Sequence, residues 1–255
     1  MRLNDIFRYA MLLAGLRPDP ALGFNLVTRL ARRVVPGYRF TWPQLEWFGA
    51  SRLNQVLDRF GEQHGFNAHR RLAIEQLMRL TSGVLGDTAE CGVYKGCGSY
   101  LILKMNQGAS TTRMHHIFDS FEGLSEPKAE DGKDWSANAL AIDDQVVRQN
   151  LREFSEFRTY KGWIPARFAE VADRTFSFVH IDVDLYDPTR HSIEFFYPRL
   201  NHGAILICDD YGFLTCPGAT GAVDEFLLDK PEKMVLLSGG GGFFVKGCLT
   251  GKETR

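Results

Sequence analysis

The sequence predicts an α/β protein with a parallel sheet covered by helices on both faces and an antiparallel hairpin at one sheet edge. From residue 88 onwards, short apolar runs alternate with stretches of helical periodicity, an arrangement typical of parallel sheets. The last two runs are joined only by Ser238 and four glycines, too few residues for a crossover helix. Acidic residues lie at the ends of four of the five strand candidates, where open α/β sheets bind ligands.

The first 65 residues are predicted to form a helical extension, and residues 66–255 the α/β domain. Four prolines between residues 18 and 43 interrupt the helical patterns of the extension. Residues 26–34 combine aliphatic side chains with Arg29, Arg32 and Arg33. This basic amphipathic pattern suits either a membrane surface or a docking helix. We favour a contact between subunits and therefore expect a homo-oligomer.

A clear amphipathic helix opens the α/β domain. Its apolar face carries Ile74, Leu77 and Met78. The opposite face is polar and carries Arg70, Arg71, Glu75 and Arg79. The pattern ends near Gly83 and Gly86, and the first strand follows.

Strands and helices then alternate along the chain. The five predicted parallel strands are Thr88–Cys91, His116–Asp119, Thr159–Lys161, Phe176–Asp182 and Ala204–Cys208. Helical periodicity covers Asp144–Phe154 and Thr189–Tyr197. Met234–Leu237 and Phe243–Lys246 are predicted to pair as the hairpin, with the glycine run as its turn.

Composition narrows the classes of partner. A formal charge of -1 provides no basic field for nucleic acid, so we expect no nucleic-acid partner. The apolar stretch Ile6–Leu16 contains Arg8 and is about half the length that spans a bilayer. No small-residue cleavage site follows it, so we expect neither a transmembrane segment nor a secretory signal. The five cysteines form no C-x-x-C pair, which favours reduced buried thiols in a cytoplasmic protein.

A glycine-rich segment follows the first predicted strand. It reads Glu90-Cys91-Gly92-Val93-Tyr94-Lys95-Gly96-Cys97-Gly98-Ser99. Glycines in this place let the backbone approach a ligand and turn into a helix. Their order differs from the G-x-G-x-x-G of dinucleotide folds, and no Lys-Ser/Thr follows as in a phosphate-binding loop. A plain tight turn explains the pattern equally well.

Asp119 ends the second predicted strand, within the segment Ile117–Leu124. An acid in this position can accept hydrogen bonds from both hydroxyls of a ribose. Capping of the following helix is the alternative interpretation. Together with the glycine-rich segment, Asp119 favours a nucleoside ligand, which need not be a redox cofactor.

The strongest signal is a set of four aspartates at the ends of two later strands. Asp182 and Asp184 follow one strand, and the adjacent Asp209 and Asp210 follow the next. Strand alternation places Asp182 and Asp184 on the same side, unless the chain has already turned. Carboxylates that share a crevice repel each other unless a cation or proton intervenes. Oxygen ligands select Mg²⁺, Mn²⁺ or Ca²⁺ over zinc, so a metal site is predicted, with a purely structural cluster as the alternative.

His180 lies inside the strand that precedes Asp182. We therefore interpret it as a buried, hydrogen-bonded histidine of the core and not as a metal ligand.

Six segments carry a family resemblance in order and approximate spacing. They are AECGVYKG (89–96), FDSFEGL (118–124), YKGWIP (160–165), HIDVDLYDPT (180–189), FYPRLNHGAILICDDYG (196–212) and CPGATGAVDEF (216–226). The sequence thereby resembles the macrocin O-methyltransferase family, whose members use S-adenosylmethionine (SAM) to methylate hydroxyls on sugars of antibiotics and related glycans. The resemblance implies a Rossmann-like, seven-stranded SAM-dependent methyltransferase fold for residues 66–255.

The resemblance also implies roles for individual residues. The methionine part of SAM would lie over Glu90, Cys91, Gly92, Val93 and Tyr94, the ribose on Asp119, and the adenine near Ser120, Phe121, Gly162 and Trp163. Ser99 and Asp182 complete the expected cofactor-binding set. By the same resemblance Asp182, Asp209 and Asp210 would hold Mg²⁺, and Asp184 would be the general base.

The acceptor is expected to be a small-molecule hydroxyl, on a sugar in preference to a phenol. Thr220-Gly221 stand where the family often carries a basic residue, and residues 1–65 match no family motif. Both regions are expected to contact acceptor or subunit. The charged segment Glu122–Ile142 has no clear periodicity, and a loop of this length is usually functional or disordered. We expect it to form a lid, with Trp135 closing over the acceptor.

Two other classes of enzyme share part of this pattern. Asp182-Val183-Asp184 resembles the D-x-D of magnesium-dependent aspartyl phosphatases, in which Asp182 would be the nucleophile. That motif is expected in the first strand, whereas here it follows the fourth. A nucleotide-sugar glycosyltransferase with a D-x-D metal site is a further alternative. Both leave the glycine-rich segment and Asp119 without a role.

Overall fold

The structure is a computed structural model. It describes residues 67–248 together with 51–62, 45–49, 20–34 and a few positions between 8 and 15. The chain divides into two compact units, Met1–Gln55 and Val56–Arg255.

The first unit contains α2 (Pro20–Val34), η1 (Glu46–Gly49) and the beginning of α3 (Ser51–Arg59), which continues into the second unit. In α2 the apolar side chains of Val27, Leu30 and Val34 are more than half exposed. This helix keeps the predicted amphipathic pattern, and a subunit contact through it stays a prediction. Among the residues that the structure describes, no helix is long and apolar enough to cross a membrane.

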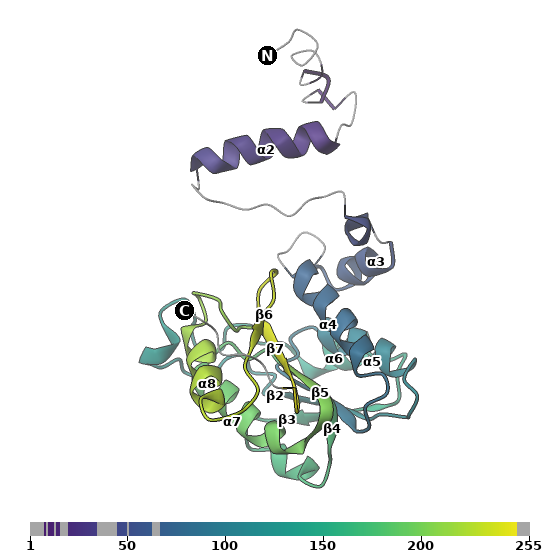
Figure 1. Cartoon of the computed structure of the whole chain (residues 1–255), viewed down its shortest axis with the longest axis vertical. Coiled ribbons are helices and arrows are strands. Elements are labelled where there is room, and N and C mark those ends of the chain that lie inside the picture. The colour runs from purple at the N-terminus through teal and green to yellow at the C-terminus, as the bar shows by residue number, and fades with distance from the viewer. Residues whose placement is uncertain are drawn as a thin grey trace. The chain divides into compact units, whose positions relative to one another are not determined.

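The second unit is built on a seven-stranded sheet with the order β3-β2-β1-β4-β5-β7-β6 (Figure 1). The strands are β1 (Asp87–Cys91), β2 (His115–Asp119), β3 (Phe157–Lys161), β4 (Phe176–Ile181), β5 (Leu200–Cys208), β6 (Val235–Leu236) and β7 (Gly242–Val245). The first five strands are parallel, and β7 is antiparallel to β5 and β6. The predicted α/β class and edge hairpin are therefore confirmed. The strand order reverses between β1 and β4, which is where open α/β sheets bind ligands.

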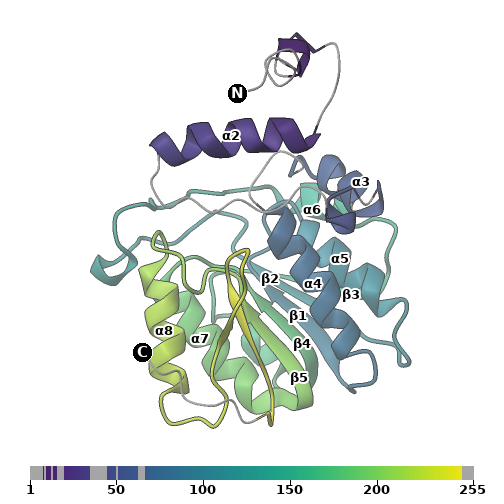
Figure 2. The same ribbon diagram turned by 45° about the horizontal axis from the view of Figure 1, so that its top comes forward.

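Helices cover both faces of this sheet (Figure 2). One face is covered by α4 (Ala68–Leu80), α5 (Cys97–Asn106) and α6 (Asp144–Asn150), whose Ile74, Leu101 and Val147 share a core cluster. The other is covered by α7 (Tyr186–Phe196) and α8 (Pro217–Leu227), whose Ile193 and Val223 belong to a second cluster. Short 3-10 helices complete the unit: η2 (Ala129–Asp131), η3 (Phe168–Val171) and η4 (Tyr197–Arg199).

Side-chain alternation along the strands decides which acids face which helices. In β4, Phe178 packs in the cluster under α4 and α5, whereas Val179 packs in the cluster under α7 and α8. Because successive strand residues point to opposite faces, His180 shares the face of Phe178. In β1, Ala89 and Cys91 pack toward α7 and α8, so Glu90 points to the α4–α5 side.

A buried polar network lies between α5 and the sheet. Asn106 Nδ2 donates to Thr88 Oγ1 at 2.8 Å, and Thr88 Oγ1 lies 2.9 Å from His115 Nδ1. His115 Nε2 in turn lies 3.0 Å from the hydroxyl of Ser99. All four side chains are buried. The partners of His115 are neutral hydroxyls, so the imidazole is satisfied without carrying a charge.

We expect His115 to make the protein less stable as the pH falls below 6.5. Burial lowers the pKa of His115 from 6.5 to about 3, and repulsion from His116 and His180 adds to this. Between these two pKa values only the unfolded chain takes up the proton, so the free energy of unfolding falls as pH falls, by up to about 1.4 kcal/mol per pH unit.

Chemical denaturation of wild type and His115→Gln at pH 7 and pH 5 measures this contribution, because glutamine does not titrate. The free energy of unfolding of wild type, minus that of His115→Gln, should be about 2 kcal/mol lower at pH 5 than at pH 7. An unchanged difference would show that His115 is protonated, or exposed, in the folded state.

Candidate active site

A cavity of about 550 Å³ lies at the carboxyl ends of the parallel strands. Its volume is in the range of small-molecule sites. Residues that follow each of the five parallel strands line it: Gly92, Val93 and Tyr94 after β1, Ser120 after β2, Trp163 and Ile164 after β3, Asp182, Val183, Asp184 and Leu185 after β4, and Asp210 after β5. The cavity therefore lies where the sequence analysis places the chemistry.

The glycine-rich segment forms the wall of the cavity between β1 and β4. Gly92 has φ +81°, and a Cβ on it would overlap the backbone carbonyl of Asp182, so only glycine fits this position. The backbone N–H of Asp182 donates to Cys91 O at 2.8 Å. These contacts bring the backbone of residues 92–94 directly beside Asp182.

Asp119 joins the ends of β1 and β2. Its Oδ2 accepts a hydrogen bond from Val93 N at 2.7 Å, and its Oδ1 accepts one from Phe121 N at 2.7 Å. Burial raises the pKa of this carboxyl, against the effect of these hydrogen bonds. Asp119 also lines the cavity. A carboxylate can accept about four hydrogen bonds, so Asp119 keeps accepting capacity for a ligand hydroxyl beside its bonds from the backbone of Val93, Phe121 and Tyr94. The geometry is compatible with the predicted ribose contact.

The residues predicted to bind the cofactor divide into two sets. Those that line the cavity are Gly92, Val93, Tyr94, Asp119, Ser120, Trp163 and Asp182. Those outside its lining are Glu90, Cys91, Ser99, Phe121 and Gly162. Glu90, Cys91 and Ser99 are buried in the sheet and under α5, because strand and helix residues point into the layers and not out of the strand ends. A direct cofactor contact by this second set stays a prediction.

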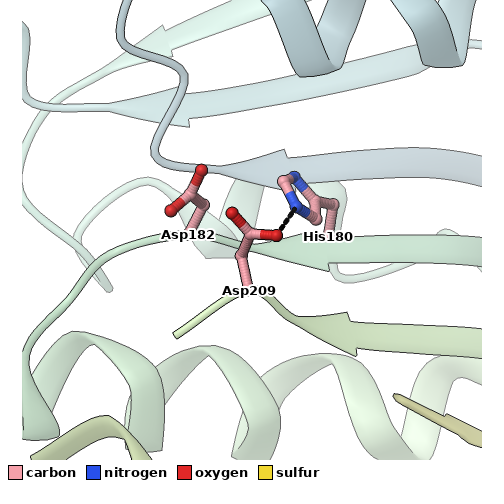
Figure 3. A group of neighbouring side chains, drawn as sticks. All are labelled: His180, Asp182 and Asp209. Carbon is pink, nitrogen blue, oxygen red and sulfur yellow. Dashed lines mark ion pairs between the residues drawn. The ribbon is translucent and has the colours of Figure 1, made fainter. Parts of the chain in front are cut away.

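The four aspartates form two groups. His180, Asp182 and Asp209 place ligand atoms within 4.8 Å of one another (Figure 3), as do Asp184, Asp210 and Cys216. The chain turns away after β4: Asp184 has φ +59°, and Leu185 N donates to Val183 O at 2.6 Å. The sequence analysis allowed for a turn after Asp182, and this turn separates Asp182 from Asp184.

The adjacent residues Asp209 and Asp210 enter different groups. Asp210 nevertheless interacts electrostatically with the other three aspartates, so the two groups adjoin. The predicted single cage of Asp182, Asp209 and Asp210 stays a prediction.

Two arginines from α4 reach the first group. Arg70 Nη2 lies 2.6 Å from Asp209 Oδ2, and Arg71 Nη1 lies 3.7 Å from Asp182 Oδ2. Arg71 is also paired with Glu62, at 2.8 Å between Nε and Oε2. Although burial alone would raise it, the attraction of Arg70 and contact with His180 hold the pKa of Asp209 below its ordinary range. Sequence periodicity placed both arginines on the polar face without a role, and the structure shows that this face meets the aspartates.

His180 lies between two carboxylates. Its Nδ1 is 2.8 Å from Glu90 Oε1, and its Nε2 is 3.4 Å from Asp209 Oδ1 (Figure 3). The side chain is fully buried, which agrees with the predicted core histidine. Burial would lower its pKa, but contacts with Asp209 and then Glu90 raise the pKa of His180 to about 10. Each ring nitrogen therefore faces a carboxylate oxygen.

Asp210 supports the turn that carries Asp184. Its Oδ2 accepts hydrogen bonds from Val183 N at 3.1 Å and from Asp184 N at 2.8 Å. These bonds hold Asp184 in the left-handed region, which is uncommon for a residue with a side chain and is often found at functional sites. Burial raises the pKa of the Asp184 carboxyl to about 7, and repulsion from Asp182 adds to the effect.

The donor atoms of this site fit a hard divalent cation. Burial, followed by repulsion from Asp209, raises the pKa of Asp182 to about 6. Burial and repulsion from Asp184 raise the pKa of Asp210 still further. Arg70 and Arg71 thus leave part of the negative charge uncompensated. Buried carboxylate oxygens of this kind are the ligands that Mg²⁺ and Mn²⁺ prefer.

The predicted lid segment 122–142 is folded and lines the cavity through Gly123, Leu124, Ser125, Trp135 and Leu140. Trp135 Nε1 donates to Thr215 O at 3.0 Å. Asp131 is buried and accepts hydrogen bonds from Lys128 N and Tyr186 N. These contacts place Trp135 at the cavity, and a closing motion over an acceptor stays a prediction.

Several further cavity residues were not singled out by sequence reasoning. They are Asn67 before α4, His191 on α7, and Phe213, Thr215 and Cys216 in the loop after β5. Of these, only Cys216 lay in a segment used for the family resemblance, and no motif assigned a role to any of them.

Comparison with known proteins gives consistent results. A sequence model of the family described as Macrocin-O-methyltransferase (TylF) matches residues 52–233. The chain is 28% identical to demethyldecarbamoylnovobiocin O-methyltransferase of Streptomyces niveus over 182 residues, 63% of this chain and 68% of that protein. It is 29% identical over 153 residues to 8-demethyl-8-(2,3-dimethoxy-alpha-L-rhamnosyl)-tetracenomycin-C 4'-O-methyltransferase of Streptomyces olivaceus, 55% of this chain and 58% of that one.

Solved structures show the same fold. The crystal structure of CalS11, a calicheamicin methyltransferase, superimposes with a TM-score of 0.65 at 18% sequence identity, covering 91% of this chain and 95% of that one. At this identity the likeness concerns the fold alone, and it agrees with the seven-stranded sheet and its edge hairpin.

Proposed function

Because the chain belongs to the macrocin O-methyltransferase family, we propose that it methylates a hydroxyl on a sugar of a natural product or glycan. It is an O-methyltransferase, and SAM is its methyl donor. The observation that carries the proposal is one cavity that is lined both by the ends of β1 and β2, with Asp119, and by Asp182, Asp184 and Asp210. The buried Asp209 lies beside Asp182. The family membership leaves the phosphatase and glycosyltransferase alternatives without support.

The donor half of the cavity is assigned to the ends of β1, β2 and β3. Here Gly92 allows close backbone approach, Asp119 offers carboxylate oxygens, and Trp163 provides a partly exposed ring. A positively charged sulfonium is favoured by the nearby negative carboxylates, and a flat adenine by an aromatic face. SAM supplies an activated methyl group that a nucleophile can displace in line.

The acceptor half is assigned to the opposite side, between the lid segment and the loop after β5. Trp135 and Phe213 contribute apolar surface there, and Thr215, Asn67 and His191 contribute polar groups. Apolar rings beside a few polar groups are typical of small-molecule sites. This lining supports a glycosidic acceptor, since the relative from Streptomyces olivaceus carries a rhamnosyl group in its substrate name.

Asp184 is assigned the proton-accepting role. An alcohol is a weak nucleophile at neutral pH, and a positioned carboxylate can remove its proton in the transition state. Asp184 lines the cavity, and its turn is fixed by Asp210. Asp182 and Asp209, with Asp210 beside them, would hold Mg²⁺. When bound, this cation would lower the pKa of an acceptor hydroxyl and fix its orientation.

Two measurements test this proposed function. Wild-type protein is incubated with methyl-labelled SAM and Mg²⁺ and with a panel of glycosides and catechol-like phenols. Label transfer to a sugar hydroxyl is expected, and exclusive transfer to phenols would contradict the sugar assignment. Thermal stabilisation by S-adenosylhomocysteine (SAH), with none by phosphate or UDP, is expected from the donor site.

Replacing Asp119 with alanine is expected to weaken SAH binding by roughly 10- to 100-fold. The change removes a half-buried carboxylate that accepts hydrogen bonds from Val93 N and Phe121 N and, in our proposal, from the ribose. Hydrogen bonds to a charged group contribute about 1.5–3 kcal/mol each. Calorimetric titration with SAH measures the effect. The control is Asp144→Ala, which removes a partly exposed carboxylate paired with Arg148 outside the cavity lining and should bind SAH like wild type. Equal affinity in Asp119→Ala would remove Asp119 from the donor site.

A further inference from the structure

A continuous line of buried polar contacts runs beneath the cavity from α5 to the end of β5. The hydroxyl of Ser99 donates to Glu90 Oε2, and Glu90 Oε1 lies 2.8 Å from His180 Nδ1. On the other side of the ring, His180 Nε2 lies 3.4 Å from Asp209 Oδ1. All four side chains are buried. The imidazole is therefore the single side chain in this line that connects Glu90 with Asp209.

The sheet topology explains why His180 can make both contacts. β4 lies between β1 and β5, and His180 is in register with Glu90 on one neighbour and with Ile207 on the other. Glu90, His180 and Ile207 all point to the α4–α5 side of the sheet, since Ala89, Val179 and Cys208 pack on the opposite side. Asp209 follows Cys208 and returns to the side of His180, as Figure 3 shows.

Glu90 transmits this contact to the glycine-rich segment. Ser99, the last residue of that segment, lies in the first turn of α5. A Cβ on Gly98 would overlap Glu90 Oε1, so the start of α5 packs closely on this carboxylate. The orientation of Glu90 is thus coupled to the backbone that lines the donor half of the cavity.

Asp209 is held from two directions. Its Oδ1 faces His180, and its Oδ2 lies 2.6 Å from Arg70 Nη2. Carboxylates that bind a metal are usually oriented by such partners, whose removal typically costs 10- to 100-fold in metal affinity. Arg70 lines the cavity, whereas His180 is enclosed in the sheet and its position is fixed.

We propose that His180 is a positioning residue that orients Asp209 for a divalent cation and ties it, through Glu90, to the cofactor-binding segment. The inference rests on the proposed function, since it concerns the metal site assigned there. It adds a physical link between the two halves of the site.

The two contacts can be removed separately, because asparagine places its amide nitrogen near the position of Nδ1 and glutamine near that of Nε2. His180→Asn keeps a donor to Glu90 and loses the contact with Asp209. We expect it to bind Mn²⁺ at least about tenfold more weakly and to bind SAH like wild type. His180→Gln keeps a donor to Asp209, and we expect nearly unchanged Mn²⁺ affinity with weaker SAH binding.

Mn²⁺ affinity is measured from the electron paramagnetic resonance signal of the free ion, and SAH affinity by calorimetry, so neither readout requires turnover. His116→Gln is the matched control: His116, like His180, is buried and pairs with a carboxylate, at 3.1 Å between Nε2 and Asp87 Oδ2. Its partner Asp87 begins β1 and so lies at the end of that strand opposite the cavity. The control variant should bind both ligands like wild type. If His116→Gln weakens Mn²⁺ binding as much as His180→Asn does, and SAH binding as much as His180→Gln does, general loss of packing explains the results and the proposal is overturned.

Asp209→Asn distinguishes failure of this inference from failure of the proposed function. If wild type does not bind Mn²⁺, or Asp209→Asn binds it equally well, the assigned metal site is wrong and the inference falls with it. If Asp209→Asn loses Mn²⁺ while His180→Asn retains it, the inference alone is overturned. If the variants do not fold, nuclear magnetic resonance of the wild-type protein tests the proposal. The ring resonances of His180 should shift when Mg²⁺ is added, and unchanged resonances would contradict the proposal.

Discussion

Replacing Asp184 with asparagine is expected to lower kcat by about 10²- to 10⁴-fold, the usual range for loss of a positioned general base. Asparagine retains the shape of the side chain but cannot accept the proton of the acceptor hydroxyl. SAH and Mn²⁺ should bind nearly as they do to wild type, because Asp184 lies in the group with Asp210 and Cys216 and not in the group with Asp182 and Asp209. Steady-state kinetics at saturating SAM and Mg²⁺ measure the change.

The control for this substitution is Asp173→Asn. The Asp173 side chain is 81% exposed and lies 4.0 Å from Arg174, so the same chemical change there should leave kcat unaltered. A fall in Mn²⁺ affinity that matches the fall in kcat would mean that Asp184 acts as a metal ligand. A kcat within about threefold of wild type would exclude it as the base, since a general base contributes far more.

The position of Asp184 depends on a residue that the family resemblance names only as a metal ligand. Asp210 uses Oδ2 to hold the backbone of Val183 and Asp184, which leaves its other oxygen for a cation. Asp210 therefore combines two tasks in one side chain. For this reason a substitution of Asp210 cannot separate metal binding from base placement, and Asp184→Asn is the more informative variant.

The sheet was predictable from sequence because its signals are local. Runs such as Phe176–Asp182 are apolar and short, and the glycines after Leu237 leave no length for a crossover. The helix α8 was not delineated, because its sequence PGATGAVDEFL contains glycines that weaken the helical pattern. Its formation depends on packing of Ala219 and Val223 against α7 and the sheet, which a single segment does not reveal.

The site residues that follow strand ends were predictable from sequence. Contacts between elements that are distant in the sequence were less predictable. Asp119, Asp182 and Asp184 line the cavity as their strand-end positions suggested. The pairing of Arg70 with Asp209 joins α4 to β5, and no local pattern links positions so far apart in the chain. A buried group of like charges does indicate that cations must lie nearby. On this ground Arg70 and Arg71 could have been predicted as residues of the site.

Removal of divalent metal is expected to abolish turnover while SAH still binds. Asp182, Asp184 and Asp210, which line the cavity, and the adjoining Asp209 bring together more negative charge than Arg70, Arg71 and His180 balance. A cation held there is worth several kcal/mol to the transition state. Treatment with EDTA should therefore lower kcat by about 100-fold or more. Added Mg²⁺ should restore it and should raise the unfolding temperature, because the cation binds the folded chain.

The donor site provides the internal control for that experiment. Asp119 and the backbone of residues 92–94 form their contacts with protein groups, so SAH affinity should change little when metal is removed. Combined loss of SAH binding and turnover would point to a cation that supports the fold. Full activity after exhaustive chelation would leave Arg70, Arg71 and His180 as the cationic partners of the aspartates, and catalysis would then depend on Asp184 and the positioning of the two substrates alone.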